Sequence, residues 1–142
     1  MNLYFKLLKT PVFNVEDVNK YYNNIDSARS AIKRLMKENM VVKIRNNMYT
    51  CISGETGQPV ANRFQIACSI TPTSYISHHT AMEYYGITDQ VFYEVYVSSE
   101  SAFRDFEFDG YTYHYVASKR NDGIDTPAFS GGIRVTNPER TI

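Results

Sequence analysis

The segment around residues 27–39 carries the strongest helical periodicity in the sequence. Its apolar positions recur at steps of three and four residues: Ala28, Ala31, Ile32, Leu35 and Met36. This spacing predicts an amphipathic helix with one buried face, capped by Asp26 or Ser27 and ended by Asn39 in a left-handed conformation. A helix of this kind must be covered on its apolar face, so the surrounding residues are expected to supply a small core.

Two shorter helices are predicted before this one. Apolar spacing favours a helix at residues 2–9, which Pro11 would end. Asn14 is a typical N-cap for a second helix that ends near Tyr22. Acidic residues fill the first turn of this second helix, where they interact favourably with the positive end of the helix dipole.

A β-hairpin is predicted directly after the periodic helix. Residues 40–45 favour a strand, and Asn46 and Asn47 turn the chain into a second strand at 48–51. Three helices followed by a hairpin is the order of a winged helix-turn-helix. In that fold the third helix enters the major groove of DNA, and the hairpin contacts the flanking backbone.

Charge is distributed unevenly, although the formal net charge is zero. Residues 1–55 contain nine basic and five acidic residues, and the rest of the chain carries the opposite excess. A basic module binds a polyanion locally even in a neutral chain. A solvated charged face on a core helix is the alternative interpretation, but the hairpin repeats the same polarity. The residues expected to contact DNA are Ser27, Arg29, Ser30, Lys33, Arg34, Lys37, Lys43, Arg45, Asn46 and Asn47.

A second part of different character is predicted beyond a polar stretch near residue 57, which favours a linker. The predicted fold class is therefore α+β: an N-terminal winged helix-turn-helix at 1–55, followed by a small mixed α/β domain with an antiparallel hairpin at 60–142. A helix start at Asn137 leads us to expect that the natural chain continues past Ile142. The elements expected in the second part are helices at 63–70 and 77–85, strands at 91–97 and 133–136, and a hairpin at 106–116.

His78, His79 and Glu83 are the residues that most suggest catalysis, because imidazole titrates near neutral pH and a nearby carboxylate can orient it. His79 and Glu83, however, also lie four positions apart on a predicted helix, where they pair simply as neighbours, and Ser77 is explained as that helix's cap. His114 lacks the spacing of a metal site. We therefore expect no enzyme activity, no cofactor and no metal. A nucleic-acid-processing enzyme using the first three residues and a protein-interaction module are the alternatives.

The sequence has no phosphate-binding glycine motif of the G-x-x-x-x-G-K-[ST] or G-x-G-x-x-G type. Its apolar runs fall short of the roughly 20 residues needed to cross a bilayer. Cys51 and Cys68 form neither a CxxC pair nor part of a zinc ligand set, so free, half-buried thiols are expected. Together these features predict a cytoplasmic protein with no membrane contact.

The stretch that begins at Ser27 and contains RLMKENMVVKIRNNMYT resembles the N-terminal DNA-binding domain of the AbiEi antitoxins of type IV toxin–antitoxin systems. That family normally has a glycine near the turn of its wing, and Asn47 stands in this place. Asparagine tolerates a left-handed backbone, so the departure is small. The segments SYISHHTAMEYYGI and IRVTNPERTI are similar to parts of the same family's second domain, and the resemblance covers nearly the whole chain.

The resemblance implies a bacterial transcriptional regulator that represses its own operon at repeated promoter sequences. It also implies an antitoxin that counteracts a nucleotidyltransferase-like toxin in phage defence, and it leaves open whether the two proteins touch. The expected partners are therefore double-stranded operator DNA and that toxin. Repeated operators would favour two copies bound side by side as a homodimer on DNA.

Overall fold

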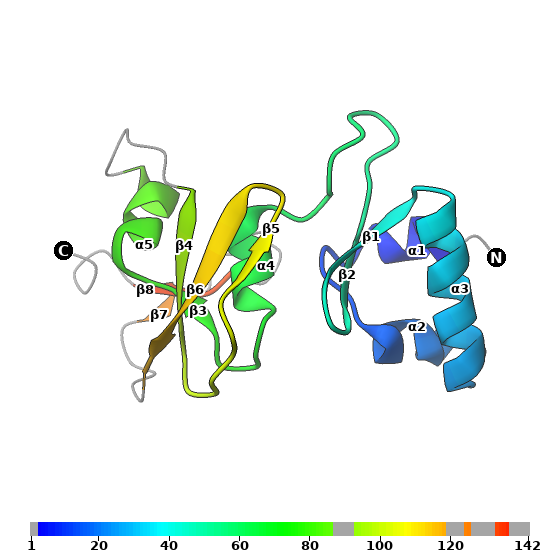
Figure 1. Cartoon of the computed structure of the whole chain (residues 1–142), viewed down its shortest axis with the longest axis horizontal. Coiled ribbons are helices and arrows are strands. Elements are labelled where there is room, and N and C mark those ends of the chain that lie inside the picture. Colours follow the sequence, from blue (N-terminus) through cyan, green and yellow to red (C-terminus); the bar gives the residue numbers. More distant parts are fainter. Residues whose placement is uncertain (1–2, 87–92, 119–123, 126–132, 137–142) are drawn as a thin grey trace. The chain divides into compact units, whose positions relative to one another are not determined.

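The computed structural model describes residues 3–86, 93–118, 124–125 and 133–136 (Figure 1). The chain divides into two compact units, Met1–Asn62 and Arg63–Ile142. Both units combine helices with a sheet, and the α+β class expected from the sequence is present. The expected helix start at Asn137 lies outside the described residues.

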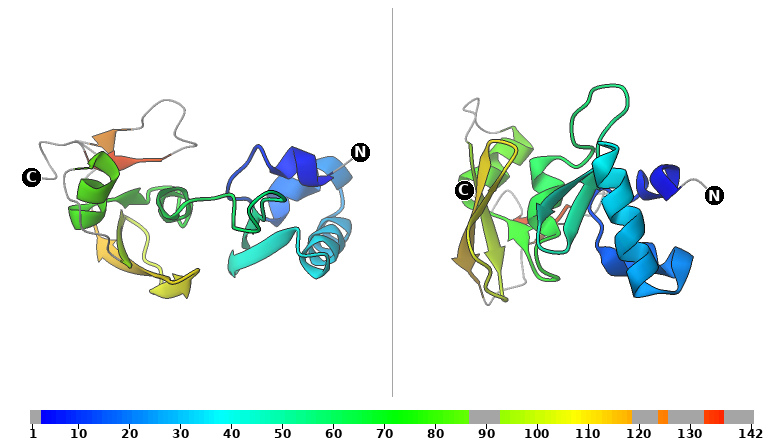
Figure 2. Two further views of the ribbon diagram at one scale, coloured as in Figure 1. Left: turned by 90° about the horizontal axis from the view of Figure 1, so that it is seen from above. Right: turned by 45° about the vertical axis from the view of Figure 1, so that its right-hand side comes forward.

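The first unit contains three helices and then a two-stranded antiparallel sheet. Its elements are α1 (Leu3–Leu7), α2 (Val15–Tyr22), α3 (Ile25–Lys37), β1 (Val41–Arg45) and β2 (Met48–Cys51). α3 packs against both α2 and β1, as Figure 2 shows from two further sides. The predicted order of elements in this unit is confirmed.

The core of the first unit forms around one side of α3. The buried residues of this core are Leu3, Leu7, Phe13, Val15, Val18, Ala28, Ala31, Ile32, Leu35, Val41 and Cys51. Four of them are the periodic residues of α3, and Met36 packs against the same cluster while partly exposed. The predicted orientation of the apolar face of α3 is therefore confirmed.

Side-chain caps determine where α2 and α3 begin. The Oδ1 atom of Asn14 accepts from the N–H of Asp17 at 2.8 Å, and an Asp17 carboxylate oxygen accepts from the N–H of Asn14 at 3.0 Å. This reciprocal pair is a capping box, and it satisfies two backbone donors at the start of α2. α3 is capped by Asn24 and not by Asp26 or Ser27, because Asn24 Oδ1 accepts from the N–H groups of both residues.

β2 is paired along both of its edges. One edge of β2 pairs with β1. At the other edge, the N–H of Tyr49 donates to the carbonyl of Phe13, and the N–H of Phe13 donates to the carbonyl of Tyr49, both at 2.9 Å. The two rings are stacked with centroids 5.9 Å apart. The hairpin is therefore attached to the connection between α1 and α2.

Residues 52–62 belong to the first unit, although the sequence suggests a linker there. The hydroxyl of Tyr4 donates to the carbonyl of Ile52 at 2.6 Å, and the N–H of Val60 donates to the carbonyl of Cys51 at 2.8 Å. These hydrogen bonds attach the segment to α1 and to β2. The compact unit thus ends later than the expected winged-helix boundary.

In its described residues, the second unit contains a six-stranded mixed sheet and two helices. The sheet order is β5-β6-β4-β3-β8-β7, in which β4–β6 and β3–β8 are parallel pairs. α4 packs against β3 and β4, and α5 packs against β4. The elements are α4 (Arg63–Cys68), β3 (Tyr75–Ile76), α5 (His78–Tyr85), β4 (Glu94–Ser99), β5 (Phe106–Phe108), β6 (Tyr111–Ala117), β7 (Ile124–Asp125) and β8 (Val135–Thr136).

The predicted hairpin turn and the predicted end of α5 are both present in this unit. The β5–β6 hairpin turns at Asp109 and Gly110, both with positive φ, and Gly86 ends α5 with a φ of 71°. Ser77 occupies the N-cap position of α5, but its side chain makes no capping hydrogen bond. Its hydroxyl is instead 2.6 Å from that of Ser98 on β4, so the cap interpretation of this side chain is wrong.

Arg134 holds the loop between α4 and β3 in place. Its Nε donates to the carbonyl of Ser74 at 2.9 Å, and its Nη2 donates to those of Cys68 and Thr71 at 2.7 and 3.3 Å. A charged guanidinium is a strong donor for carbonyl groups that have no partner at the end of a helix. This arginine therefore fixes the end of α4 beside β8.

Candidate nucleic-acid interface

Besides the acidic Asp26, six polar residues of α3 project from the side of the helix opposite its buried face. At about 100° per residue, the buried positions cluster within one third of the helical circumference and the polar positions occupy the other side. All six polar side chains are exposed to solvent, and four of them are cationic. These residues are Ser27, Arg29, Ser30, Lys33, Arg34 and Lys37. We call them the polar face of α3.

The polar face of α3 has two rows of different character. Arg29, Lys33 and Lys37 follow each other at four-residue steps and form a basic row. The other row contains Ser27, Ser30 and Arg34, which line a shallow depression of about 350 Å³ together with Tyr22, Asn24 and Asp26. Asp26 places a carboxylate in this depression, so the first row is the more strongly cationic.

The expected hairpin residues differ in exposure. Lys43 and Asn46 are exposed to solvent, whereas Arg45 is half-buried. Lys43 lies opposite Tyr49 in the strand register. Lys43 and Asn46 are therefore the hairpin side chains that are best exposed to an external ligand.

Asn47 is exposed at the hairpin turn, but its amide makes two contacts with the start of α2. Its Oδ1 accepts from the N–H of Val15 at 2.9 Å, and its Nδ2 donates to a carboxylate oxygen of Glu16 at 3.2 Å. The N–H of Val15 lies at the first position of the helix, where no intrahelical acceptor exists. Asn47 therefore acts as a second cap of α2, from a residue 32 positions away.

The same contacts place an acidic residue beside the polar face of α3. The hydrogen bond from Asn47 is the largest cause that lowers the pKa of Glu16, followed by backbone hydrogen bonding at Glu16 itself, and the positive charge of Arg29 adds to it. The hairpin turn, the start of α2 and the first cation of α3 are thus neighbours. Sequence reasoning missed this role of Glu16, because acids in the first helical turn are already explained by the helix dipole.

Of the three residues considered for catalysis, the structure describes the side chains of His78 and Glu83. His78 is exposed and has a φ of 54°, and the side chain of His79 is outside the described part of the structure. Glu83 has a side chain only 5% exposed and forms an ion pair with Arg63 at 3.3 Å. This ion pair links the carboxylate of α5 to α4.

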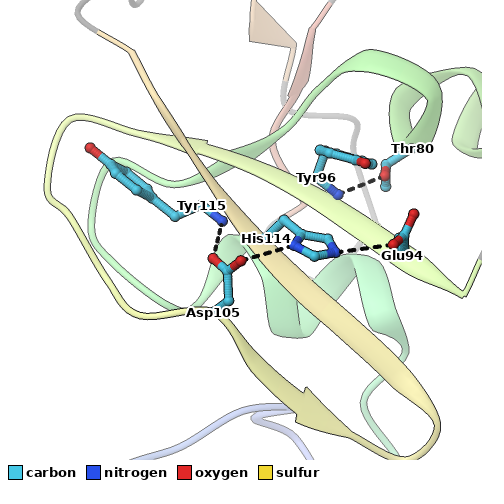
Figure 3. A network of polar contacts seen from close by, with 6 residues as sticks. All are labelled: Thr80, Glu94, Tyr96, Asp105, His114 and Tyr115. Atoms are coloured by element: carbon cyan, nitrogen blue, oxygen red, sulfur yellow. Dashed lines mark hydrogen bonds and ion pairs between the residues drawn. The ribbon is translucent and has the colours of Figure 1, made fainter.

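His114 is the centre of a polar network in the second unit (Figure 3). Its Nδ1 is 2.9 Å from an oxygen of Asp105, and its Nε2 is 3.4 Å from an oxygen of Glu94. The imidazole also stacks on Tyr96, its partner in the β4–β6 register, with centroids 5.3 Å apart. Because the two carboxylates lie at opposite ring nitrogens, they cannot converge on one metal ion together with this imidazole. The network links β6 to β4 and to the loop before β5.

Asp105 also accepts from the N–H of Tyr115 at 2.9 Å. This backbone hydrogen bond is the main cause that lowers the pKa of Asp105, and the hydrogen bond with His114 is the next. Tyr115 and His114 are consecutive on β6, so one carboxylate fixes two adjacent residues of the strand. We interpret the network as a structural connection within the sheet.

Cys51 and Cys68 are both buried and free. Burial raises the pKa of the Cys51 thiol to about 11, and burial likewise raises the pKa of Cys68. Over the described residues, His, Cys, Asp and Glu side chains form no group of three suited to a metal ion. In the same part of the chain, every helix is too short or too polar to span a bilayer.

Comparison with models of known protein families gave no match to this chain, and comparison with curated proteins gave none either.

Proposed function

We propose that the first unit is a winged helix-turn-helix that binds double-stranded DNA, with α3 in the major groove and the β1–β2 hairpin as its wing. The observation that carries this proposal is the polar face of α3, in which four cations and two serines lie opposite the buried face. Cationic side chains neutralise phosphates, and arginine also donates two hydrogen bonds to guanine in the major groove.

The dimensions of α3 suit this role. Its 13 residues give a length of about 20 Å, and an α-helix fits the width of the major groove. Lys33 and Arg34 lie in the middle of its polar face. Lys43 and Asn46 would contact the flanking backbone from the hairpin, since both are exposed.

The biological role that we propose for this binding is transcriptional regulation. The resemblance of the sequence to AbiEi antitoxins supports repression of the protein's own operon at repeated sequences and antagonism of a nucleotidyltransferase-like toxin. Two copies would then occupy neighbouring repeats. The second unit carries the antitoxin role in this proposal, and its acidic excess makes it the less suitable unit for DNA.

The experiment that tests DNA binding is a fluorescence anisotropy titration of the whole chain. The probe is a duplex from upstream of its own reading frame, with a scrambled duplex of equal length as comparison. Tighter binding to the upstream duplex is expected, with affinity that falls as salt rises. Replacing Lys33 by Ala should flatten the plot of log affinity against log salt by about one unit.

Lys9→Ala is the matched control, because it removes the same charge from the turn after α1 and not from α3 or the hairpin. It should leave the slope nearly unchanged. Absence of binding to either duplex would overturn the proposal. Equal effects of Lys33→Ala and Lys9→Ala would reject α3 as the contacting helix.

A further inference from the structure

Asn47 is an exposed residue of the hairpin turn whose side-chain amide makes two hydrogen bonds with the start of α2. Its carbonyl oxygen accepts from Val15, and its amide nitrogen donates to Glu16. Its backbone has a φ of 55°, a left-handed conformation that asparagine tolerates better than most residues. The turn conformation therefore directs the amide toward α2.

We propose that Asn47 is a positioning residue, which holds the hairpin turn against the start of α2, and that it does not itself contact DNA. This inference rests on the proposed function, because the position of the hairpin matters only if the hairpin meets a duplex. The two contacts with α2 use the acceptor oxygen and one of the two donor hydrogens of the Asn47 amide, so turning this amide toward a phosphate or a base edge would cost those contacts. Asn46 is adjacent in the turn and exposed, so it is the more suitable contact.

Glu16 gains a second role from the same arrangement. The hydrogen bond from Asn47 holds its carboxylate at the start of α2, close enough to Arg29 for the two charges to interact. A fixed negative charge at this place repels the phosphate backbone and offsets part of the charge of Arg29. Glu16 therefore weakens binding to any duplex, whatever its sequence, and makes the interface more dependent on specific contacts.

The first experiment is a double-mutant cycle on the whole chain, using Glu16→Gln, Asn47→Asp and the combination of the two. Asn47→Asp keeps the acceptor for Val15 but places a second carboxylate beside Glu16. In the double variant, the glutamine introduced at position 16 is the donor and the aspartate introduced at position 47 is the acceptor of the side-chain contact, the reverse of the original pair. The net charge of this variant equals that of the original chain. Affinity for the upstream duplex is measured for all four proteins at one salt concentration.

The expected result is strong coupling. Asn47→Asp should lower affinity about tenfold when Glu16 is present, and less than about twofold when Glu16 has been replaced by Gln. Glu16→Gln alone should raise affinity about two- to threefold, because it removes one repulsive charge and keeps an acceptor for Asn47. If Asn47 touched DNA directly, Asn47→Asp would cost the same factor with either residue at position 16, and that outcome would overturn the proposal.

Asn46→Asp is the matched control, because it adds the same charge in the same turn without a partner on α2. It should lower affinity by an equal factor with either residue at position 16. Coupling of similar size for both asparagines would show a general charge effect and would also overturn the proposal.

A second measurement does not require DNA. Asn47→Gly keeps a backbone that allows positive φ and removes the amide, so hydrogen exchange at the N–H of Val15 should accelerate at least about tenfold. Unchanged exchange would reject the positioning role even if DNA binding is confirmed. Accelerated exchange in a chain that binds no duplex would leave Asn47 as a cap of α2 and overturn the proposed function alone.

Discussion

Ile32 and Lys33 are consecutive residues of α3 that face opposite environments: the side chain of Ile32 is 2% exposed in the core, whereas Lys33 projects into solvent. Ile32→Ala should therefore lower the free energy of unfolding of the first unit by about 2–5 kcal/mol, because it leaves a cavity beside α2 and β1. Lys33→Ala should change it by less than about 0.5 kcal/mol. Urea denaturation followed by circular dichroism measures both changes.

The same two substitutions should have the opposite relative effects on DNA affinity: Lys33→Ala should lower it more than Ile32→Ala does. Measured at a temperature where Ile32→Ala remains folded, its affinity should stay close to that of the original chain, while Lys33→Ala weakens binding. A large loss of stability in Lys33→Ala would contradict the orientation of α3.

Replacement of Arg134 by Lys should destabilise the second unit. An ammonium group cannot reproduce the donors that Arg134 directs to the carbonyls of Ser74, Cys68 and Thr71, so a loss of about 2 kcal/mol is expected. Hydrogen exchange at Ile76, whose N–H donates to the carbonyl of Arg134, should accelerate in the variant. Arg104→Lys is the control, since Arg104 is exposed, and it should leave this exchange rate unchanged.

The Cys51 thiol should resist alkylation well above neutral pH. With a pKa of about 11, only about 1% of this buried thiol is ionised at pH 9, and the thiolate is the reactive form. Because an unfolded cysteine ionises near pH 8.5, stability linked to Cys51 is fully present below that pH and is lost as the pH rises above it. Mass spectrometry after iodoacetamide treatment between pH 7 and 10 tests this, with the urea-unfolded chain as the fast reference.

The carboxyl group of Asp105 should titrate below the ordinary range of aspartate, and should still do so in a His114→Ala variant. The N–H of Tyr115 is the main cause that lowers the pKa of Asp105, and this backbone donor remains when the imidazole is removed. NMR titration of the carboxyl carbon should therefore show only a partial rise in the midpoint. A return to the ordinary value would assign the shift to His114 instead.

The sign of the linkage follows from the lowered pKa of Asp105. Its contribution to stability is present above about pH 4, the ordinary value for aspartate, and is lost as the pH falls through the lower folded value. Because Asp105 is 53% exposed, solvent screens this contribution and the acid side of the unfolding profile should shift only slightly in Asp105→Asn.

Sequence patterns predict the elements of the first unit well because their causes are local. The three- and four-residue spacing of Ala28, Ile32 and Leu35 sets the buried side of α3, and the acids after Asn14 mark the start of α2. The cap of α3 lies two to three residues before the predicted position, because the Asn24 side chain accepts from the N–H groups of Asp26 and Ser27.

Contacts between distant residues could not be predicted in this way. The Asn47–Val15 bond joins residues 32 positions apart, and the Arg63–Glu83 pair joins residues 20 positions apart. Sequence proximity indicates His79 as a neighbour of Glu83 on the helix, and the ion pair of Glu83 with Arg63 is a contact that only the fold supplies. The parallel pairing of β4 with β6 and the two-residue strand β3 likewise depend on the assembled sheet, because short strands lack a periodic signal.

The backbone pairing of Phe13 with Tyr49 has a consequence for the energetics of recognition. A flexible hairpin would lose conformational entropy on binding a ligand, and this loss would lower the affinity. In this protein the hairpin is already ordered when the chain folds, because the second edge of β2 is hydrogen-bonded to Phe13. A duplex would therefore meet a preorganised surface, and selectivity would depend on fit more than on adaptation.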